Sequence, residues 1–128
     1  MYTIGDFLIQ IKNAYGARKK QIEYRYSNAV ASIGKILEKE GFISKLKEKT
    51  TDKKKSLIID LKYNGKVPAV SQIKIISKPS VHYFLGKSRI KRRFPSHALG
   101  IISTSRGIMT SKQAEKEGVG GELICQIS

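Results

Sequence analysis

The sequence contains one cysteine, three prolines and no tryptophan. Cys125 has no second cysteine to pair with, and the chain lacks any Cys/His spacing of the kind that holds a metal ion. No apolar run approaches the roughly 20 residues of a membrane span, and the N-terminus lacks the basic-then-apolar layout of a signal peptide. We therefore expect a soluble protein of a reducing compartment, with no metal, cofactor or membrane partner and with Cys125 as a buried thiol.

Acidic residues are also scarce. The chain has 10 Asp and Glu residues against 25 Lys and Arg residues, for a formal net charge of +15 and a pI near 10.0. Because solubility alone does not require so large an excess, the composition indicates a polyanionic partner. No acidic residue occurs between Leu61 and Ala114, and this stretch is the predicted electrostatic footprint. Its cations are Lys62, Lys66, Lys74, Lys78, Lys87, Arg89, Lys91, Arg92, Arg93, Arg106 and Lys112.

Signals of catalysis or of a small-molecule substrate are missing. Neither His82 nor His97 has an acid partner nearby in the sequence, and no serine lies in the glycine pattern of a nucleophile elbow. The glycines from Gly118 to Gly121 lie where a predicted helix runs into a strand, which is the reverse of the strand-to-helix order of a phosphate-binding loop. We therefore expect that the protein is not an enzyme.

Apolar periodicity predicts an α/β unit in the first half of the chain. Apolar residues at spacings of three and four from Ile4 to Ile11 indicate one amphipathic helix. Ser27 begins a second helix, and Gly41 marks its end because glycine readily adopts the left-handed conformation found there. Strands are predicted at residues 21–26, 42–47 and 56–63, the last two forming an antiparallel hairpin around a polar turn at residues 48–55.

The second half is predominantly β. Strands are predicted at residues 71–79, 97–105 and 121–128, and Thr110 with Gln113 forms a capping-box pair for a short helix that stops at Gly118. Gly65 interrupts the pattern and indicates a boundary. The predicted fold class is α+β with two small subdomains. Residues 1–65 form an N-terminal α/β unit with an antiparallel hairpin, and residues 66–128 form a C-terminal, mainly β unit with one short helix.

The segment STSRGIMTSKQAEKEGVGGE, residues 103–122, has three hydroxyls before an Arg-Gly turn and ends in an acid that follows paired glycines. Once cations have attracted a nucleic-acid backbone, Ser and Thr can bond a base edge or a ribose 2′-OH, and a carboxylate can accept from base amino or imino groups. Glycines allow close approach of the main chain. In the alternative interpretation the TSRG stretch is only a tight turn and Glu122 is an ion-pair partner of Arg106. The residues alone leave both open.

The stretch SKPSVHYFLGKSRIKRRF, residues 77–94, is both aromatic and basic. His82, Tyr83 or Phe84 can stack on an unpaired base, although a place in the core is an equally good interpretation of the aromatic residues. Five cations within seven residues, with no acid nearby, predict contacts with phosphates. These cations are Lys87, Arg89, Lys91, Arg92 and Arg93.

The segment from Ser103 to Ile127 resembles the C-terminal signature of the small-subunit ribosomal protein S-eight family, in its bacterial or organellar type. The shared pattern is Ser-Thr-Ser-x-Gly, an apolar residue, Met-Thr, then Gly-x-Gly-Gly-Glu and a final apolar strand. The similarity extends over the whole chain, because DFLIQIKNA, ILEKEGFI and SKP also match at suitable spacing.

This resemblance implies a structural constituent of the small ribosomal subunit that binds a helical arm of small-subunit rRNA and supports subunit assembly. Its implied partners are that rRNA and neighbouring small-subunit ribosomal proteins, in a ribosome of the bacterial cytoplasm or of a mitochondrion or plastid. The resemblance implies RNA contacts from the Ser-Thr-Ser loop, from the Gly-Gly-Glu turn, from the end of the first helix and from the start of the second. The basic and aromatic stretch, residues 77–94, adds further contacts. The resulting RNA-binding residues are Ser103, Thr104, Ser105, Arg106, Gly107, Gly120, Gly121, Glu122, Lys78, Phe84, Lys87, Arg89, Arg92, Arg93, Lys12, Asn13 and Ser27.

The chain departs from the family pattern at several positions. Tyr2-Thr3 replaces a common Asp-Pro start, Asn28 a basic residue, Ser80 a glycine and Phe84 a tyrosine, and residues 96–98 replace a Gly-x-Gly. These changes affect the aromatic contact at Phe84 and the start of the strand that follows residues 96–98. The Ser-Thr-Ser loop and the Gly-Gly-Glu turn keep the family pattern. The competing hypothesis is a free-standing nucleic-acid-binding regulator or RNA chaperone.

Overall fold

A computed structural model describes residues 3–76, 82–86, 89–90, 94 and 98–128. Within these ranges three helices and mostly antiparallel strands form two compact units, which confirms the predicted α+β class. One unit is Asp6–Ser71, and the other is Gln72–Ser128 with the N-terminal residues up to Gly5. Gly65 lies in the turn between two short strands with φ of 69°.

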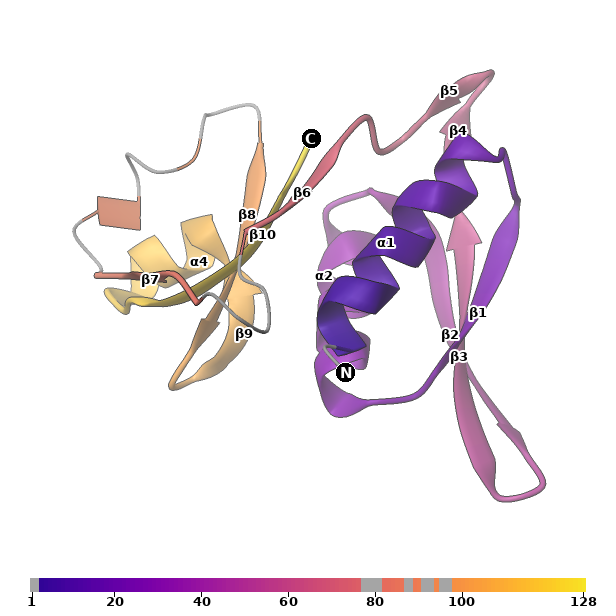
Figure 1. The fold of residues 1–128 in the computed structure, drawn as a ribbon, viewed down its shortest axis with the longest axis horizontal. Coiled ribbons are helices and arrows are strands. Elements are labelled where there is room, and N and C mark those ends of the chain that lie inside the picture. Colours follow the sequence, from indigo (N-terminus) through magenta and orange to yellow (C-terminus); the bar gives the residue numbers. More distant parts are fainter. Residues whose placement is uncertain (1–2, 77–81, 87–88, 91–93, 95–97) are drawn as a thin grey trace. The chain divides into compact units, whose positions relative to one another are not determined.

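The first unit contains α1 (Thr3–Gly16) from Asp6 onward, β1 (Gln21–Arg25), α2 (Asn28–Lys39), β2 (Ile43–Thr51) and β3 (Lys54–Leu61), followed by the short strands β4 (Tyr63–Asn64) and β5 (Val67–Pro68). The sheet order is β1-β3-β2, with both pairs antiparallel. Figure 1 shows α1 and α2 on one side of this sheet. The core between helices and sheet is formed by Phe7, Leu8, Ile11, Val30, Ile33, Leu37, Leu57 and Ile59.

The predicted start of α2 is confirmed. The Ser27 hydroxyl oxygen accepts from the backbone N–H of Val30 at 3.1 Å and caps the helix, and Gly41 follows its end with φ of 81°. At α1, by contrast, the Asp6 carboxylate accepts from the hydroxyl of Tyr24 at 2.8 Å. This acid therefore joins α1 to β1 rather than serving only the helix end.

The hairpin of β2 and β3 is longer than its sequence predicted. Only Asp52 and Lys53 form the turn, with φ values of 47° and 67°, and the strands continue up to them. Two consecutive residues with positive φ give the turn that matches the twist of antiparallel strands. Because the distal strand residues are mostly Lys and Thr rather than apolar, this stretch has the composition of a polar loop. Figure 1 shows the hairpin extending past both helices.

The outer edge of β2 is partly covered by a helix side chain. A carboxylate oxygen of Glu38, in the last part of α2, accepts from the backbone N–H of Leu46 at 2.7 Å. A Cβ added to Gly34 would lie 3.0 Å from the Leu46 methyl groups, so α2 packs closely against this strand.

The second unit contains β6 (Ile73–Ile75), β7 (Phe84–Leu85), β8 (Leu99–Thr104), β9 (Gly107–Thr110), α4 (Ser111–Glu117) and β10 (Gly121–Ile127). The order β6-β10-β8-β9, with β7 also pairing to β10, makes β10 the central strand. The hydroxyl of Thr110 caps α4 by accepting from Gln113 N–H at 3.1 Å, and Gly118 ends it with φ of 69°. The core on the α4 side is formed by Ile76, Leu85, Ile90, Phe94, Ile102, Met109, Ala114, Val119 and Leu123.

Candidate nucleic-acid interface

Three predicted segments converge at one corner of the C-terminal sheet. Glu122 of β10 is registered with Phe84 of β7 on one side and with Ser103 of β8 on the other. Directly opposed residues in antiparallel strands point to the same face. The Leu123 side chain points to the α4 core, so Phe84, Glu122 and Ser103 share the opposite face. The fold therefore juxtaposes the aromatic cluster, the Ser-Thr-Ser segment and the Gly-Gly-Glu segment.

Gly121 is required by the close approach of β8 and β10. It is registered with Thr104, and a Cβ placed on it would lie 2.9 Å from the carbonyl carbon of Ser103, with the carbonyl oxygen nearer still. Any larger residue would push the two strands apart, so this glycine fixes the spacing of the corner. Gly120 immediately precedes the strand.

The β8–β9 turn uses one of the three predicted hydroxyls internally. The hydroxyl of Thr104 accepts from the backbone N–H of Arg106 at 3.1 Å and donates to the carbonyl of Gly107 at 2.8 Å. Gly107 has φ of 112°, a conformation that favours glycine. Thr104 is thus a turn-forming residue, and the exposed hydroxyl at the tip belongs to Ser105.

Arg106 forms an ion pair with Glu117 of α4, at 3.3 Å, and not with Glu122 as the alternative interpretation of the sequence supposed. Glu117 also accepts from the side-chain amide of Gln113 at 2.8 Å. The hydrogen bond from Gln113, together with Arg106, lowers the pKa of Glu117. The Arg106 side chain remains 60% exposed, so it can still contact an approaching phosphate.

Glu122 is held by a residue that the sequence did not connect to it. One oxygen of its carboxylate contacts Nδ1 of His82, forty positions earlier in the chain. Glu122 is 22% exposed and His82 is 48% exposed, so the carboxylate is oriented by the imidazole and its second oxygen remains able to accept. No acid lies near His82 in the sequence, and strand pairing rather than sequence proximity brings it to Glu122.

Phe84 is the aromatic residue presented at this corner. Its side chain is 72% exposed, while the neighbouring Leu85 packs into the core. Tyr83 is 51% exposed, and its backbone carbonyl accepts from Leu123 N–H at 2.8 Å, which ties the segment to β10. The core alternative for these two aromatic residues is thus wrong, whereas Phe94 is buried.

Only part of the predicted basic cluster can be placed. Arg89 is exposed and directly precedes the buried Ile90. The other predicted cations of this cluster lie outside the described residues. They are Lys78, Lys87, Lys91, Arg92 and Arg93.

The predicted residues of the N-terminal unit do not form one cluster. Lys12 and Asn13 are exposed near the C-terminal end of α1, where Asn13 borders a hollow of 440 Å³ with Gln21 and Glu23 of β1. Ser27 follows the other end of β1, beyond Tyr24, which contacts α1 at Asp6. Asn13 and Asp6 are seven residues apart, or about 10 Å along a helix. Lys12 and Asn13 therefore lie at the opposite end of the unit from Ser27.

The described residues offer no site for metal chemistry. No group of three or more His, Cys, Asp and Glu side chains within them is arranged to hold an ion. None of the helices in the described ranges is long and apolar enough to cross a membrane. Cys125 is fully buried, as expected, and burial raises the pKa of its thiol.

Comparisons with known proteins identify the family. Residues 2–128 match the family model described as Ribosomal protein S8. The chain is 40% identical to the small ribosomal subunit protein uS8 of Dictyoglomus turgidum over 124 residues, covering 97% of this chain and 95% of that protein. It is 40% identical to the uS8 of Syntrophobacter fumaroxidans, over 97% of this chain and 95% of the relative. Identity to the uS8 of Thermosynechococcus vestitus is 37%, over 98% and 96% respectively. Sequence, fold and comparisons agree that this chain belongs to the ribosomal protein S8 family.

Proposed function

We propose that this protein is a structural, non-catalytic constituent of the small ribosomal subunit that binds a helical arm of small-subunit rRNA and supports subunit assembly. The single observation that carries the proposal is the juxtaposition of Phe84, Ser103 and Glu122 on one face of the C-terminal sheet of a chain with net charge +15. The aromatic and basic stretch and two parts of the family signature become one surface there.

In this proposal the cations attract the RNA and the corner recognises its shape. The exposed Ser105 hydroxyl bonds a base edge or a 2′-OH, and Phe84 stacks on an unpaired base. Glu122, oriented by His82, accepts from base amino or imino groups. Thr104 and Gly121 act indirectly, because they set the turn and the strand spacing that position these groups.

The proposal also covers the phosphate contacts, the neighbouring proteins and the compartment. Exposed Arg89 and Arg106 contact phosphates, with the basic residues outside the described ranges, and Lys12, Asn13 and Ser27 give the N-terminal unit, residues 1–65, its own RNA contacts. Neighbouring small-subunit ribosomal proteins are this protein's other partners. The relatives come from bacteria, which supports a ribosome of the bacterial cytoplasm or of an organelle of bacterial type.

The test is equilibrium binding, at fixed near-physiological salt, to the rRNA arm and to a length-matched RNA duplex. Glu122→Ala is compared with wild type and with Glu115→Ala, which removes an equal charge from an exposed position on α4. Hydrogen bonds to charged groups contribute about 1.5–3 kcal/mol, so Glu122→Ala should weaken arm binding by roughly ten- to one-hundred-and-fifty-fold. Glu115→Ala should not weaken it.

Whether Glu122→Ala weakens or strengthens RNA binding distinguishes recognition of the RNA by Glu122 from simple repulsion of phosphate. If Glu122 only repels phosphate, its removal strengthens binding to both RNAs, and the recognition role is refuted. Equal affinity of wild type for arm and duplex supports the free-standing, non-specific binder instead.

A further inference from the structure

We propose that the open face of the N-terminal sheet is a second RNA contact, which binds a stretch of phosphate backbone through residues separate from those of the C-terminal corner. The contact consists of Arg25, Lys49 and Lys54, which we call the basic face. The inference rests on the proposed function in that it takes the partner to be RNA, but it uses none of the residues assigned to the corner.

Strand register places these three cations on one side of the sheet. Arg25 of β1 is registered with Ser56 of β3, and Ser56 is registered with Lys49 of β2. Lys54 lies two positions before Ser56 on β3 and therefore points the same way. All three cations are exposed. The result is a patch across three strands, with the hydroxyl of Ser56 at its centre.

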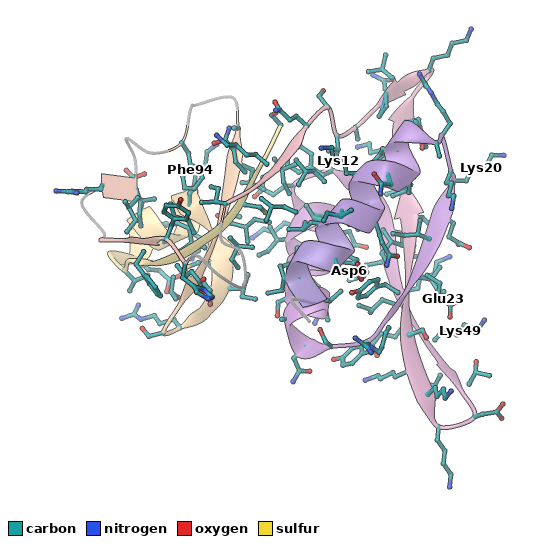
Figure 2. The ribbon with its side chains drawn as sticks, viewed as in Figure 1. Asp6, Lys12, Lys20, Glu23, Lys49 and Phe94 are labelled. Carbon is teal, nitrogen blue, oxygen red and sulfur yellow. The ribbon has the colours of Figure 1, made fainter. Side chains whose placement is uncertain are left out.

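The helices cover the other side of the sheet. Tyr24, Leu57 and Ile59, which alternate with the residues of the basic face, are buried. Tyr24 contacts Phe7 of α1, with ring centroids 5.1 Å apart. Figure 2 shows Lys49 and Glu23 on the side of the sheet away from α1, whereas Asp6 lies on the side of the helix.

The acids near the patch do not neutralise it. Asp60 is held at the other end of the sheet by Gln21 at 2.6 Å and by Lys47 at 3.4 Å, and these contacts lower its pKa. Glu48 lies on the opposite face and pairs with Lys55 at 3.4 Å. The remaining acids are Glu23, two residues from Arg25 and opposite Ile58, and Asp52, in the turn two residues before Lys54.

Among the described residues, none of the three cations of the basic face takes part in an ion pair. The three cations of the basic face outnumber the two nearby acids, Glu23 and Asp52, so the face keeps a local positive potential. Such a patch attracts a polyanion.

The dimensions and chemistry of the basic face fit a phosphate backbone. Residues two apart along a strand are about 6.7 Å apart, and two strand spacings are about 9.6 Å, so the patch spans several phosphates. Ser56 and Thr51 add hydroxyls between the cations, and such groups commonly bond phosphate oxygens. A protein interface of this size would need an apolar or aromatic centre. The only apolar side chain on this face is the half-buried Ile58, so RNA is the better occupant.

The test compares two triple variants with the same change of net charge. Arg25→Gln/Lys49→Gln/Lys54→Gln removes the basic face, and Lys35→Gln/Lys39→Gln/Lys116→Gln removes exposed cations from the two helices α2 and α4. The probe is an rRNA fragment that contains the arm and its flanking helices, titrated over a range of salt concentrations. Each lost phosphate contact lowers the log-log salt slope by about 0.7 to 0.9.

The basic-face variant should therefore lose about 1.4 or more of slope, from two or three contacts, and the matched control should lose less than half as much. The basic-face variant should still prefer the arm over the duplex, because its C-terminal corner is unchanged. Equal slopes in the two variants, or no change in either, would overturn the proposal. The proposal would also be overturned if the basic-face variant kept its salt slope for RNA binding but failed to enter assembled subunits. That result would assign the face to a protein partner.

Chemical protection of the RNA separates this inference from the function proposed above. Nucleotides that lose protection with the basic-face variant should differ from those that lose it with Glu122→Ala. If the basic-face variant changes the salt slope while Glu122→Ala leaves the arm preference unaffected, the second contact is retained. The corner is then rejected as the recognition site. Loss of protection at the same nucleotides in both variants would refute a separate contact.

Discussion

Replacing Gly121 by alanine tests whether the corner depends on the close approach of two strands. The added Cβ would lie 2.9 Å from the Ser103 carbonyl carbon, whereas ordinary contacts begin at 3.4 Å. Because β10 pairs with β8 on one side and with β6 and β7 on the other, it cannot move without disturbing a second pairing. Overpacking costs about 1–3 kcal/mol, and one or two weakened hydrogen bonds add about 1 kcal/mol each.

We therefore expect Gly121→Ala to lower the free energy of unfolding by about 2–5 kcal/mol, or the Tm by roughly 10 °C or more. The measurement is urea unfolding followed by circular dichroism, with arm binding measured under conditions where the variant is folded. Gly16→Ala is the matched control, because nothing lies within 4 Å of the added Cβ and the residue ends α1. The control should gain up to about 0.5–1 kcal/mol. If Gly121→Ala is as stable as the control, the close-approach argument is wrong.

Three further outcomes follow from described contacts. Burial and the bond to Asp6 raise the pKa of Tyr24 to about 12 from 10.0, so the protonated form is favoured in the folded state. That stability is complete below pH 10 and lost as pH rises towards 12, by on the order of 2 kcal/mol. Tyr24→Phe should reduce this alkaline decline by that amount in unfolding experiments, and a decline as large as that of the wild type would contradict the assignment. Phe84→Ala should weaken arm binding by about 1–3 kcal/mol without changing the Tm, since the ring is 72% exposed; unchanged affinity would rule out stacking. Cys125 should resist alkylation in the native state and react once urea unfolds the chain, because its thiol is buried and its pKa is raised; rapid native labelling would show that the core opens.

Local signals in the sequence predicted most of the helix boundaries. Ser27 and Thr110 cap helices as expected, and Gly41 and Gly118 have the positive φ expected after helix ends. These features depend on side chains only a few positions away, so the sequence carries them directly. The short strands β4, β5 and β7 were not predicted, because two residues cannot display an alternating pattern.

The candidate site was predictable as a set of residues but not as a geometry. The family signature identified Ser103 and Glu122, whereas their pairing across β8 and β10 follows from strand register. The contact between His82 and Glu122 depends on the same register, over a separation that no local pattern reports. Sequence reasoning also assigned Thr104 and Gly121 to RNA, and the structure shows that each has a role within the protein itself.

The contact between Glu38 and the backbone of β2 bears on how the free protein avoids self-association. An edge strand with unpaired N–H groups is a template for strand addition by another chain. The Glu38 carboxylate occupies the N–H of Leu46 on that edge, and lysines flank it along β2. A second copy would have to displace the carboxylate and bring its own positive charges against these lysines. The hairpin that carries part of the positive charge therefore also discourages strand addition at its own edge.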